Sequence, residues 1–433
     1  MKMYVESLGC AKNQVDTEMI VGALRDSIDL TNKPDDADLI LVNTCAFIDS
    51  AKKEAIDTIL MLADYKKPNS KLVVCGCLPK RYKPELIGLL PEVDRFITIE
   101  EYNEFSKIIK DVMNSSYIKE NDLSFMNRYI TTPDYMRYIR ISDGCLNHCA
   151  FCAIPLIRGK LKSRTIEDIY EEVKQAVSEG VYEINLISQD TTRYGFDIYK
   201  KNSLVELLDK LCQIEGDFKI RLLYLYPDIV TDELIDFIKN NPKVMPYFDI
   251  PIQHSEDVVL KAMYRRGNRE YLVNLFKKIR REIPGSIIRT TFIVGFPFER
   301  EAEFENLLKF VDEIKFDRLG AFTFSLEEGT KACEYPNVIS EDEKQRRYEK
   351  LMALQEGISL KLNQELLGKT IDGFITGYDE ESYLFIARSA GYAPDDIDGC
   401  IYVAAKDEHQ IGDRIKIKVL DCDAYTLTGE ESK

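Results

Sequence analysis

The sequence predicts an α/β protein of three domains: an open parallel α/β sheet, an incomplete six-unit (β/α) barrel, and a small all-β barrel. Three observations support this. At 433 residues the chain is longer than one ordinary core requires. Apolar strand-like runs alternate with amphipathic helical patterns through most of its length. After about residue 366 this pattern gives way to short alternating segments separated by Gly and Asp turns.

The first hundred residues are expected to form the open sheet. Apolar runs at residues 3–7, 39–43 and 72–74 are separated by helical patterns at 17–25 and 51–62. Alternation of this kind is typical of a parallel sheet. The polar stretch 114–127 that follows resembles a linker more than core sequence. A first domain over residues 1–115 is therefore predicted.

The middle of the chain repeats the alternation six times. The predicted strands are 138–142, 182–189, 219–225, 247–253, 287–294 and 319–324, with amphipathic helices such as 166–176, 204–211 and 303–314. These spacings suit right-handed crossovers, and six of them make an incomplete barrel. Ser340 then opens a long charged helix with a capping box. The second domain is expected over residues 131–365.

The last segment is expected to form the small all-β barrel, over residues 366–433. Its predicted strands are 373–377, 383–387, 400–404 and 414–419. The segment is acidic, since residues 369–433 hold seven Lys and Arg against fourteen Asp and Glu. Such a surface would repel a phosphate backbone and attract a basic protein.

Composition narrows the class of protein further. Hydrophobic residues make up 45% and charged residues 30%, and no apolar run reaches membrane-spanning length. The N-terminus lacks the apolar stretch of a secretory signal, so a cytoplasmic protein without a membrane partner is expected. Eleven cysteines then indicate metal or redox chemistry, because the cytosol keeps thiols reduced. The net charge of −16 argues against a broad nucleic-acid footprint.

Three cysteines lie close together just after the first predicted barrel strand. Cys145, Cys149 and Cys152 form a C-x3-C-x2-C run. Three thiolates on a four-iron cluster leave one iron open for a substrate. A structural zinc site would need a fourth ligand, and His148 has poor geometry for that role because it is adjacent to Cys149. We interpret His148 as a loop residue.

Three further cysteines are spread over the first domain. Cys10, Cys45 and Cys77 each follow a predicted parallel strand. Because open α/β sheets gather their sites at the carboxyl ends of strands, the three thiols are expected to converge. Taken singly, each could be a small apolar core residue. The remaining cysteines, which are interpreted as structural, are Cys75, Cys212, Cys333, Cys400 and Cys422.

The C-x3-C-x2-C run, with Phe151 before its third cysteine, resembles the cluster loop of the radical S-adenosylmethionine (SAM) superfamily. The resemblance implies a 4Fe–4S cluster on Cys145, Cys149 and Cys152, with SAM chelated to its open iron. It also implies reductive cleavage of SAM to a 5′-deoxyadenosyl radical. That superfamily uses a partial (β/α)6 TIM barrel, in agreement with the six predicted units. A metal knot without catalysis is the alternative.

Nearly the whole chain is similar to the methylthiotransferase family of that superfamily. The motifs concerned are Gly9-Cys10-Ala-Lys-Asn13-Gln-Val-Asp16, Asn43-Thr44-Cys45 and Gly76-Cys77. The resemblance implies a second 4Fe–4S cluster on Cys10, Cys45 and Cys77, and a TRAM-like C-terminal barrel. One SAM would methylate a sulfur held at this second cluster. A second SAM would give the radical that activates the substrate.

Four other residues are expected to contact the cofactor SAM. Phe151 lies in the cluster loop, and Ser188 and Gln189 close the second barrel strand, where a simple strand-to-loop cap is the alternative. Gly295 lies in a segment similar to the one that packs its backbone on the adenine in the superfamily. Turn chemistry would explain this glycine equally well.

Two features stay open on sequence alone. The basic run Arg158-Gly-Lys160-Leu-Lys162-Ser-Arg164 follows the cluster loop and could meet an anionic substrate group or be a solvated loop. His254 ends a predicted strand and could be satisfied structure or pocket lining.

Members of the family modify either a transfer RNA base or the β-carbon of an aspartate in a small-subunit ribosomal protein. The acidic tail favours the basic protein, small-subunit protein twelve, as the partner. The segments 189–192, 249–254 and 388–399 also look like those of the ribosomal-protein enzyme. A tRNA (adenine) methylthiotransferase is the first alternative, and a non-enzymatic iron–sulfur carrier is the second. The electron donor is expected to be a flavodoxin or ferredoxin.

Overall fold

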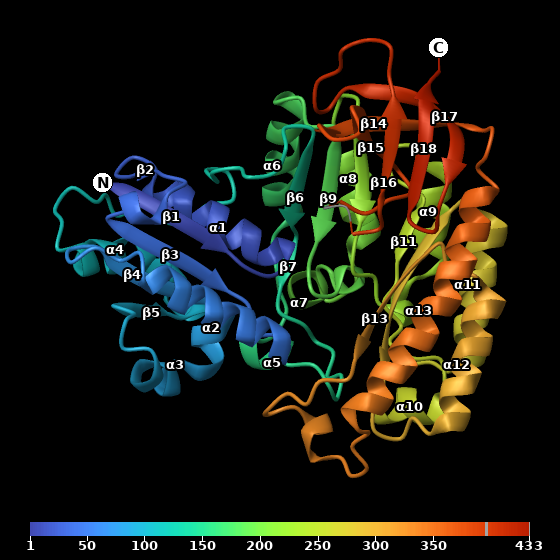
Figure 1. Ribbon diagram of the computed structural model, residues 1–433, viewed down its shortest axis with the longest axis horizontal. Helices are drawn as coiled ribbons and strands as arrows, with labels where there is room; N and C mark the ends of the chain where they lie inside the picture. The colour runs from blue at the N-terminus through green and yellow to red at the C-terminus, as the bar shows by residue number, and fades with distance from the viewer. Residues whose placement is uncertain (395–396, 433) are drawn as a thin grey trace.

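The computed structural model describes residues 1–394 and 397–432. It confirms the predicted fold class, because a parallel sheet, a partial β/α barrel and a small β-barrel follow one another along the chain (Figure 1). In Figure 1 the sheet is blue, the partial barrel runs from green to orange, and the small barrel is red. Asp395 and Asp396, part of the acidic tail, lie outside the described residues.

The N-terminal sheet is parallel throughout, with strand order β2-β1-β3-β4-β5. Its strands are β1 (Lys2–Ser7), β2 (Asp29–Leu30), β3 (Leu39–Thr44), β4 (Lys71–Gly76) and β5 (Arg95–Ile97), and its helices are α1 (Ala11–Leu24), α2 (Asp49–Ala63), α3 (Cys77–Leu89) and α4 (Phe105–Met113). Helix α1 begins well before the predicted residue 17. The sequence pattern misses its first turn because the buried apolar side chains of α1 start only at Val15.

The central domain has the six predicted parallel strands, and they form two three-stranded sheets of order β10-β9-β6 and β11-β12-β13. The strands are β6 (Met136–Arg140), β9 (Glu183–Ile187), β10 (Lys219–Leu222), β11 (Tyr247–Asp249), β12 (Ile287–Val294) and β13 (Arg318–Thr323). Strands β10 and β11 end earlier than predicted. Tyr224 and Gln253 adopt positive φ angles of 62° and 70°, which extended strands do not allow.

Helices surround these strands and bury the largest apolar core of the chain against them. They are α6 (Ile166–Ser178), α8 (Leu204–Cys212), α9 (Asp232–Asn240), α11 (Arg269–Glu282), α12 (Glu301–Ile314) and α13 (Glu341–Gln364), with the short α5 (Ile154–Ile157), α7 (Phe196–Tyr199) and α10 (Asp257–Ala262) and the hairpin β7 (Ser142–Asp143) and β8 (Lys162–Ser163). Half of the predicted capping box of α13 is present, since the Ser340 side chain accepts a hydrogen bond from the Glu343 backbone, while the Glu343 carboxylate bonds to Arg346 and Arg347 instead of to the Ser340 backbone.

The C-terminal domain is a closed barrel of order β14-β15-β16-β18-β17. Its strands are β14 (Thr370–Asp379), β15 (Leu384–Ser389), β16 (Cys400–Ala404), β17 (Arg414–Cys422) and β18 (Thr426–Glu431). The fifth strand, β18, was not predicted, because its sequence contains Gly429 and two terminal glutamates. A parallel pairing with β16 and an antiparallel pairing with β17 hold it in place and close the barrel.

The small barrel covers the N-terminal ends of the central strands. Phe374 of β14 packs against Tyr135 and Tyr182, which directly precede β6 and β9, with ring centroids 4.8 and 6.3 Å apart. Buried Arg388 of β15 forms an ion pair of 2.8 Å with Glu183, the first residue of β9. The cysteine loop after β6 therefore lies at the other end of the strands (Figure 1).

The N-terminal sheet packs beside the central domain through buried ion pairs. Arg128 bridges Glu18 of α1 and Glu172 of α6, at 3.0 and 2.7 Å. Thus the residue that directly follows the predicted linker joins two domains. No helix among the described residues is both long and apolar enough to cross a membrane.

Candidate active site

Cys145, Cys149 and Cys152 lie in one loop at the C-terminal end of the central strands. The backbone holds this loop in place: Ala150 donates to the carbonyl of Met263 at 2.9 Å and accepts from Ala332 at 2.7 Å. Two neighbouring strand connections therefore fix the loop from both sides. His148 is exposed, as expected for a loop residue.

Two side chains contact Cys149 from outside the loop. The Tyr226 hydroxyl and Nη1 of Arg265 each lie 3.7 Å from its sulfur, and the Arg265 guanidinium stacks 4.2 Å above the Tyr226 ring. A nearby cation favours the thiolate over the thiol. No sequence pattern pointed to either residue, because one follows β10 and the other follows α10.

The environment of these thiols suits a cationic metal cluster. Burial is the main cause that raises the pKa of Cys145 to about 11 and that also raises the pKa of Cys152, and the neighbouring thiols contribute to both increases. Buried thiols of this kind stay protonated unless positive charge compensates the thiolate, which iron would do.

Cys10, Cys45 and Cys77 follow the C-terminal ends of β1, β3 and β4, three adjacent strands of the N-terminal sheet. Asn13 joins two of these strand ends, since its side-chain amide donates to the carbonyls of Leu8 and Thr44 at 2.9 and 3.0 Å. Gly9 has φ of +92°, and a Cβ there would lie 2.7 Å from the Cβ of Cys45. The backbone thus brings Gly9 directly against the second cysteine.

Arg158 reaches from the central domain into this second site. One of its terminal nitrogens donates to Oδ1 of Asn13 at 2.7 Å and lies 3.7 Å from the Cys77 sulfur, while the other pairs with Asp16 at 2.7 Å. Burial raises the pKa of Cys77 to about 12, and Arg158 opposes that rise. The solvated-loop interpretation of the basic run is wrong for Arg158 and for Arg164, because both side chains are buried and Arg164 pairs with Glu172.

Neither set of thiols, as the structure describes it, is spaced to hold a single metal ion. Among the described residues no three Cys, His, Asp or Glu side chains surround one metal-ion position. A four-iron cluster binds each thiolate through a different iron, so its ligands lie farther apart than those of one zinc. Cys75 is fully buried in the sheet core, as expected for strand packing.

Buried polar side chains follow the C-terminal end of β9 and could bind a ligand. The Ser188 hydroxyl lies 3.3 Å from that of Thr191 and is fully buried. Gln189 donates to Asp143 at 3.0 Å, but its Oε1 is buried without a hydrogen-bond partner in the described chain. A buried amide oxygen of this kind needs a donor, which the amino or ribose groups of SAM could supply. Asp190, the next residue, accepts from Asn147 of the cysteine loop at 2.6 Å.

Gly295 follows β12, with φ of +75°. Its bare face packs on the Lys344 side chain, where a Cβ would lie 2.3 Å from Cγ. Its backbone nitrogen donates to Glu299 at 2.9 Å, and Glu299 also bonds to buried His254 and to Arg347. Packing against Lys344 thus explains why a glycine stands at this position. The hydrogen bond to Glu299 makes His254 a satisfied structural residue.

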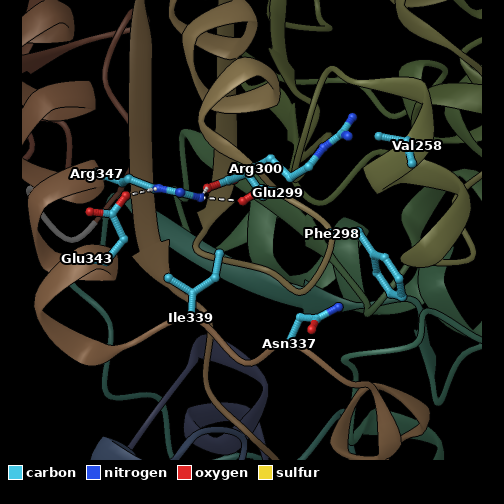
Figure 2. A pocket seen from close by; sticks show the side chains of 8 residues that line it. All are labelled: Val258, Phe298, Glu299, Arg300, Asn337, Ile339, Glu343 and Arg347. Carbon is cyan, nitrogen blue, oxygen red and sulfur yellow. Dashed lines mark hydrogen bonds and ion pairs between the residues drawn. The ribbon is translucent and has the colours of Figure 1, made fainter.

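A hollow of about 610 Å³ lies beside this turn (Figure 2). Figure 2 shows Arg347 bonded to both Glu343 and Glu299 within it. Because these charged groups are paired with one another, the hollow presents little free polar capacity to a ligand. None of its lining residues is a cysteine. A separate hollow of about 530 Å³ has Gly9 and Cys10 in its wall.

The ring of Phe151, the aromatic residue of the cysteine loop, packs edge to face on Phe296, which follows Gly295. The two ring centroids are 6.4 Å apart. The loop and the turn that were both expected at the cofactor are therefore neighbours in space.

The partial barrel, with three cysteines in one loop at the C-terminal ends of its parallel strands, defines a radical SAM enzyme. The sequence model of the radical SAM superfamily matches residues 139–311. The model of uncharacterized protein family UPF0004 matches residues 2–98, and that of the TRAM domain matches residues 367–431. The superfamily implies a 4Fe–4S cluster and SAM as cofactors.

Relatives named ribosomal protein uS12 methylthiotransferase RimO align along the full chain. That of Clostridium botulinum (strain Hall) is 45% identical over 99% of this chain and 98% of the relative. Those of Carboxydothermus hydrogenoformans and Aquifex aeolicus are 44% and 45% identical, over 99% and 100% of this chain and 99% and 98% of the relatives. The chain belongs to the RimO family of radical SAM methylthiotransferases.

Solved structures share the fold at low sequence identity. The radical SAM methyltransferase TsrM from Kitasatospora setae gives a TM-score of 0.52 at 11% identity, covering 74% of this chain and 71% of TsrM. The cobalamin-dependent SAM radical enzyme OxsB gives 0.51 at 12%, covering 80% of this chain and 56% of OxsB. At these identities the likeness concerns the fold alone.

Proposed function

We propose that this enzyme transfers a methylthio group to the β-carbon of an aspartate in ribosomal protein uS12. The observation that carries the proposal is the 45% identity, over 99% of the chain, to relatives named as uS12 methylthiotransferases. The acidic C-terminal domain supports a basic protein substrate over a transfer RNA. The reaction would take place in the cytoplasm, with a flavodoxin or ferredoxin as electron donor.

The proposal includes two 4Fe–4S clusters, one held by Cys145, Cys149 and Cys152 and the other by Cys10, Cys45 and Cys77. When bound, the clusters supply reductive cleavage of SAM and a site for the sulfur that is transferred. In the proposed division the domains comprise residues 1–115, 131–365 and 366–433.

The protein's own contribution is to hold the two cysteine sets in a fixed relation. Arg158 is six residues beyond Cys152 and contacts Cys77, so a single short segment joins the two sites. Its guanidinium and Asp16 are both buried. Desolvated ion pairs of this geometry resist rearrangement, because separating the charges leaves one without a partner. Holding the two sites in fixed positions limits the side reactions that could quench the radical before it reaches the substrate.

Cofactor contacts are proposed for Phe151, Ser188, Gln189 and Gly295. The support comes from their common position at the C-terminal ends of the central strands. Gln189 is the strongest of the four, since its unsatisfied amide oxygen is available to a donor. Gly295 would contribute backbone only, since its bare face is covered by Lys344.

The small barrel lies at the end of the strands remote from the cysteines. Contacts between it and uS12 would therefore involve parts of the substrate distant from the reacting aspartate. Such contacts add affinity and on-rate without touching the reacting atoms.

The test is an anaerobic reaction of the reconstituted enzyme with dithionite, SAM and either purified uS12 or unmodified transfer RNA. An adduct of about 46 Da, the exchange of hydrogen for SCH3 in this two-cluster chemistry, is expected on uS12 by intact mass. Adduct on the RNA alone would overturn the assigned substrate. Formation of 5′-deoxyadenosine distinguishes the enzyme from an electron carrier.

A further inference from the structure

Lys12, two residues after Cys10, is a largely buried residue whose ammonium has no carboxylate partner. The residue is 7% exposed, and it takes part in no hydrogen bond or ion pair within the described chain. Its ammonium lies 3.3 Å from the centre of the Tyr224 ring. Its stem is buried and its ammonium is not among the fully buried atoms, so the nitrogen stays open to a ligand while the aromatic face supplies only a weak partner.

The surrounding acids are already committed. Asp16, one helical turn from Lys12, pairs with Arg140 and Arg158. Asp249 accepts from the Tyr224 backbone at 2.9 Å with one oxygen and pairs with an arginine through the other. Asp16 and Asp249 are the acids that helical spacing and the Tyr224 contact bring nearest to Lys12. Because both already have partners, neither is a counter-ion for the Lys12 ammonium.

Helix α1 adds to the positive potential here. Lys12 lies in its first turn, where the helix dipole is positive, and that turn contains no acidic residue. The Cys10 side chain does not cap the helix. A cation in a first turn is unfavourable unless an anion compensates it, so three features favour the same ligand: the ammonium, the dipole and the missing counter-ion.

Lys12 also lies where the two domains that carry the cysteine sets meet. Along one chain segment it is two residues from Cys10. Its ring partner Tyr224 is two residues from Tyr226, whose hydroxyl lies 3.7 Å from the Cys149 sulfur. An anion bound to this ammonium would therefore lie at the junction of the two domains, beside a segment from each.

We infer that Lys12 binds the carboxylate of the substrate aspartate and so determines the specificity for that side chain. The inference rests on the proposed function, in which the carbon next to that carboxylate receives the methylthio group. Fixing the carboxylate would orient the β-carbon, because only one bond separates the two carbons. Binding would also remove the electrostatic cost of the unpaired ammonium.

The test is a double-mutant cycle between Lys12 and the modified aspartate. The aspartate is located by mass spectrometry of wild-type product, and uS12 with Asn at that position is the second substrate. Values of kcat/KM are measured for wild type, Lys12→Met, Lys12→Arg and the exposed control Lys33→Met. Iron content and circular dichroism confirm that each variant is loaded and folded.

Wild type and Lys33→Met should favour the Asp over the Asn substrate by at least about 30-fold, the usual effect of breaking a buried charge pair. Lys12→Met should lose that preference, and Lys12→Arg should restore part of it. Equal losses on both substrates would overturn the inference. So would a raised KM for SAM or a shifted cluster reduction potential with the preference intact, which would assign Lys12 to SAM or to the cluster. No adduct from wild type would overturn both the proposed function and this inference.

Discussion

The two sets of three cysteines obtain their geometry in different ways. Cys145, Cys149 and Cys152 lie within one loop, so short-range backbone structure determines how they face one another. Cys10, Cys45 and Cys77 come from three strands, and only the order and register of the sheet make them neighbours. A local site of this kind can be found from its spacing, whereas a dispersed one depends on the whole domain.

Register explains how the dispersed set converges. Ser7 pairs with Asn43, and Thr44 pairs with Gly76, so the three strands end level with one another. A slip of one residue would turn each strand's side chains to the other face and separate the thiols. The dispersed site is therefore the more sensitive to changes elsewhere in its domain.

Replacing one cysteine of each set should separate their roles most strongly. Cys149→Ala is expected to abolish both 5′-deoxyadenosine formation and methylthiolation, because it removes a ligand of the proposed SAM-cleaving cluster. Cys10→Ala is expected to abolish methylthiolation while 5′-deoxyadenosine still forms. Anaerobic assays with chromatography and intact mass measure both products. Equal loss of both activities in Cys10→Ala would contradict the division of labour.

Arg158→Met should damage the dispersed site through the domain junction. Asp16 would keep only Arg140 as a partner, and loss of a buried ion pair costs about 3–5 kcal/mol. Chemical denaturation measures that loss. Iron per chain should fall from about eight toward about four, the content of a single cluster.

The matched variant is Arg265→Met, which removes a cation from Cys149 instead. It should lower 5′-deoxyadenosine formation more than Arg158→Met does, and Arg158→Lys should retain part of the iron. If the two methionine variants lost the same activities to the same extent, the two arginines would not serve separate sites.

Gly9→Ala should have a smaller effect confined to the dispersed site. A side chain at φ of +92° is strained, and its Cβ would displace Cys45, at a combined cost of about 1–3 kcal/mol. Gly144→Ala is the counterpart in the local site, since a Cβ there would lie 2.2 Å from the Lys160 carbonyl oxygen. Electron paramagnetic resonance should show a weakened signal from a different cluster in each variant.

Arg388→Met should affect the chemistry least, because it lies at the far end of the strands. Burial alone would raise the pKa of Glu183, but Arg221 and Arg388 together lower it. The stabilisation is present above the usual carboxyl pKa and is lost as the pH falls through the lowered value. The variant should therefore undock its small barrel at a higher pH than wild type, measured by limited proteolysis of apoenzyme. A change in 5′-deoxyadenosine formation above about twofold would argue that the distant domain acts on the site.

Several elements could be predicted from the sequence because their signals are local. The alternation of strands and helices, the cap at Ser340 and the C-x3-C-x2-C loop all depend on residues a few positions apart. Errors appeared where a local pattern met a tertiary constraint. The positive φ angles at Tyr224 and Gln253 shortened two strands, and pairing with β16 and β17 made a strand of residues with weak strand propensity.

The residues around the thiols could not be predicted for a related reason. Tyr226 and Arg265 reach Cys149 from separate barrel connections, and Arg158 crosses a domain boundary to reach Cys77. Their partners are distant in the sequence, so no spacing rule connects them. A basic run beside a cluster loop was visible, but whether its arginines faced solvent or buried acids was not.

By itself the sequence determined the fold class, the family and the six cysteines proposed to carry the chemistry, because residue type and short-range spacing encode these. The tertiary structure alone decided which cations are paired and which end of the barrel the acidic domain covers. It left Lys12 largely buried and without a counter-ion at the junction of the two domains. Pairing and burial depend on which distant segments meet, and free energy rather than sequence spacing selects those contacts.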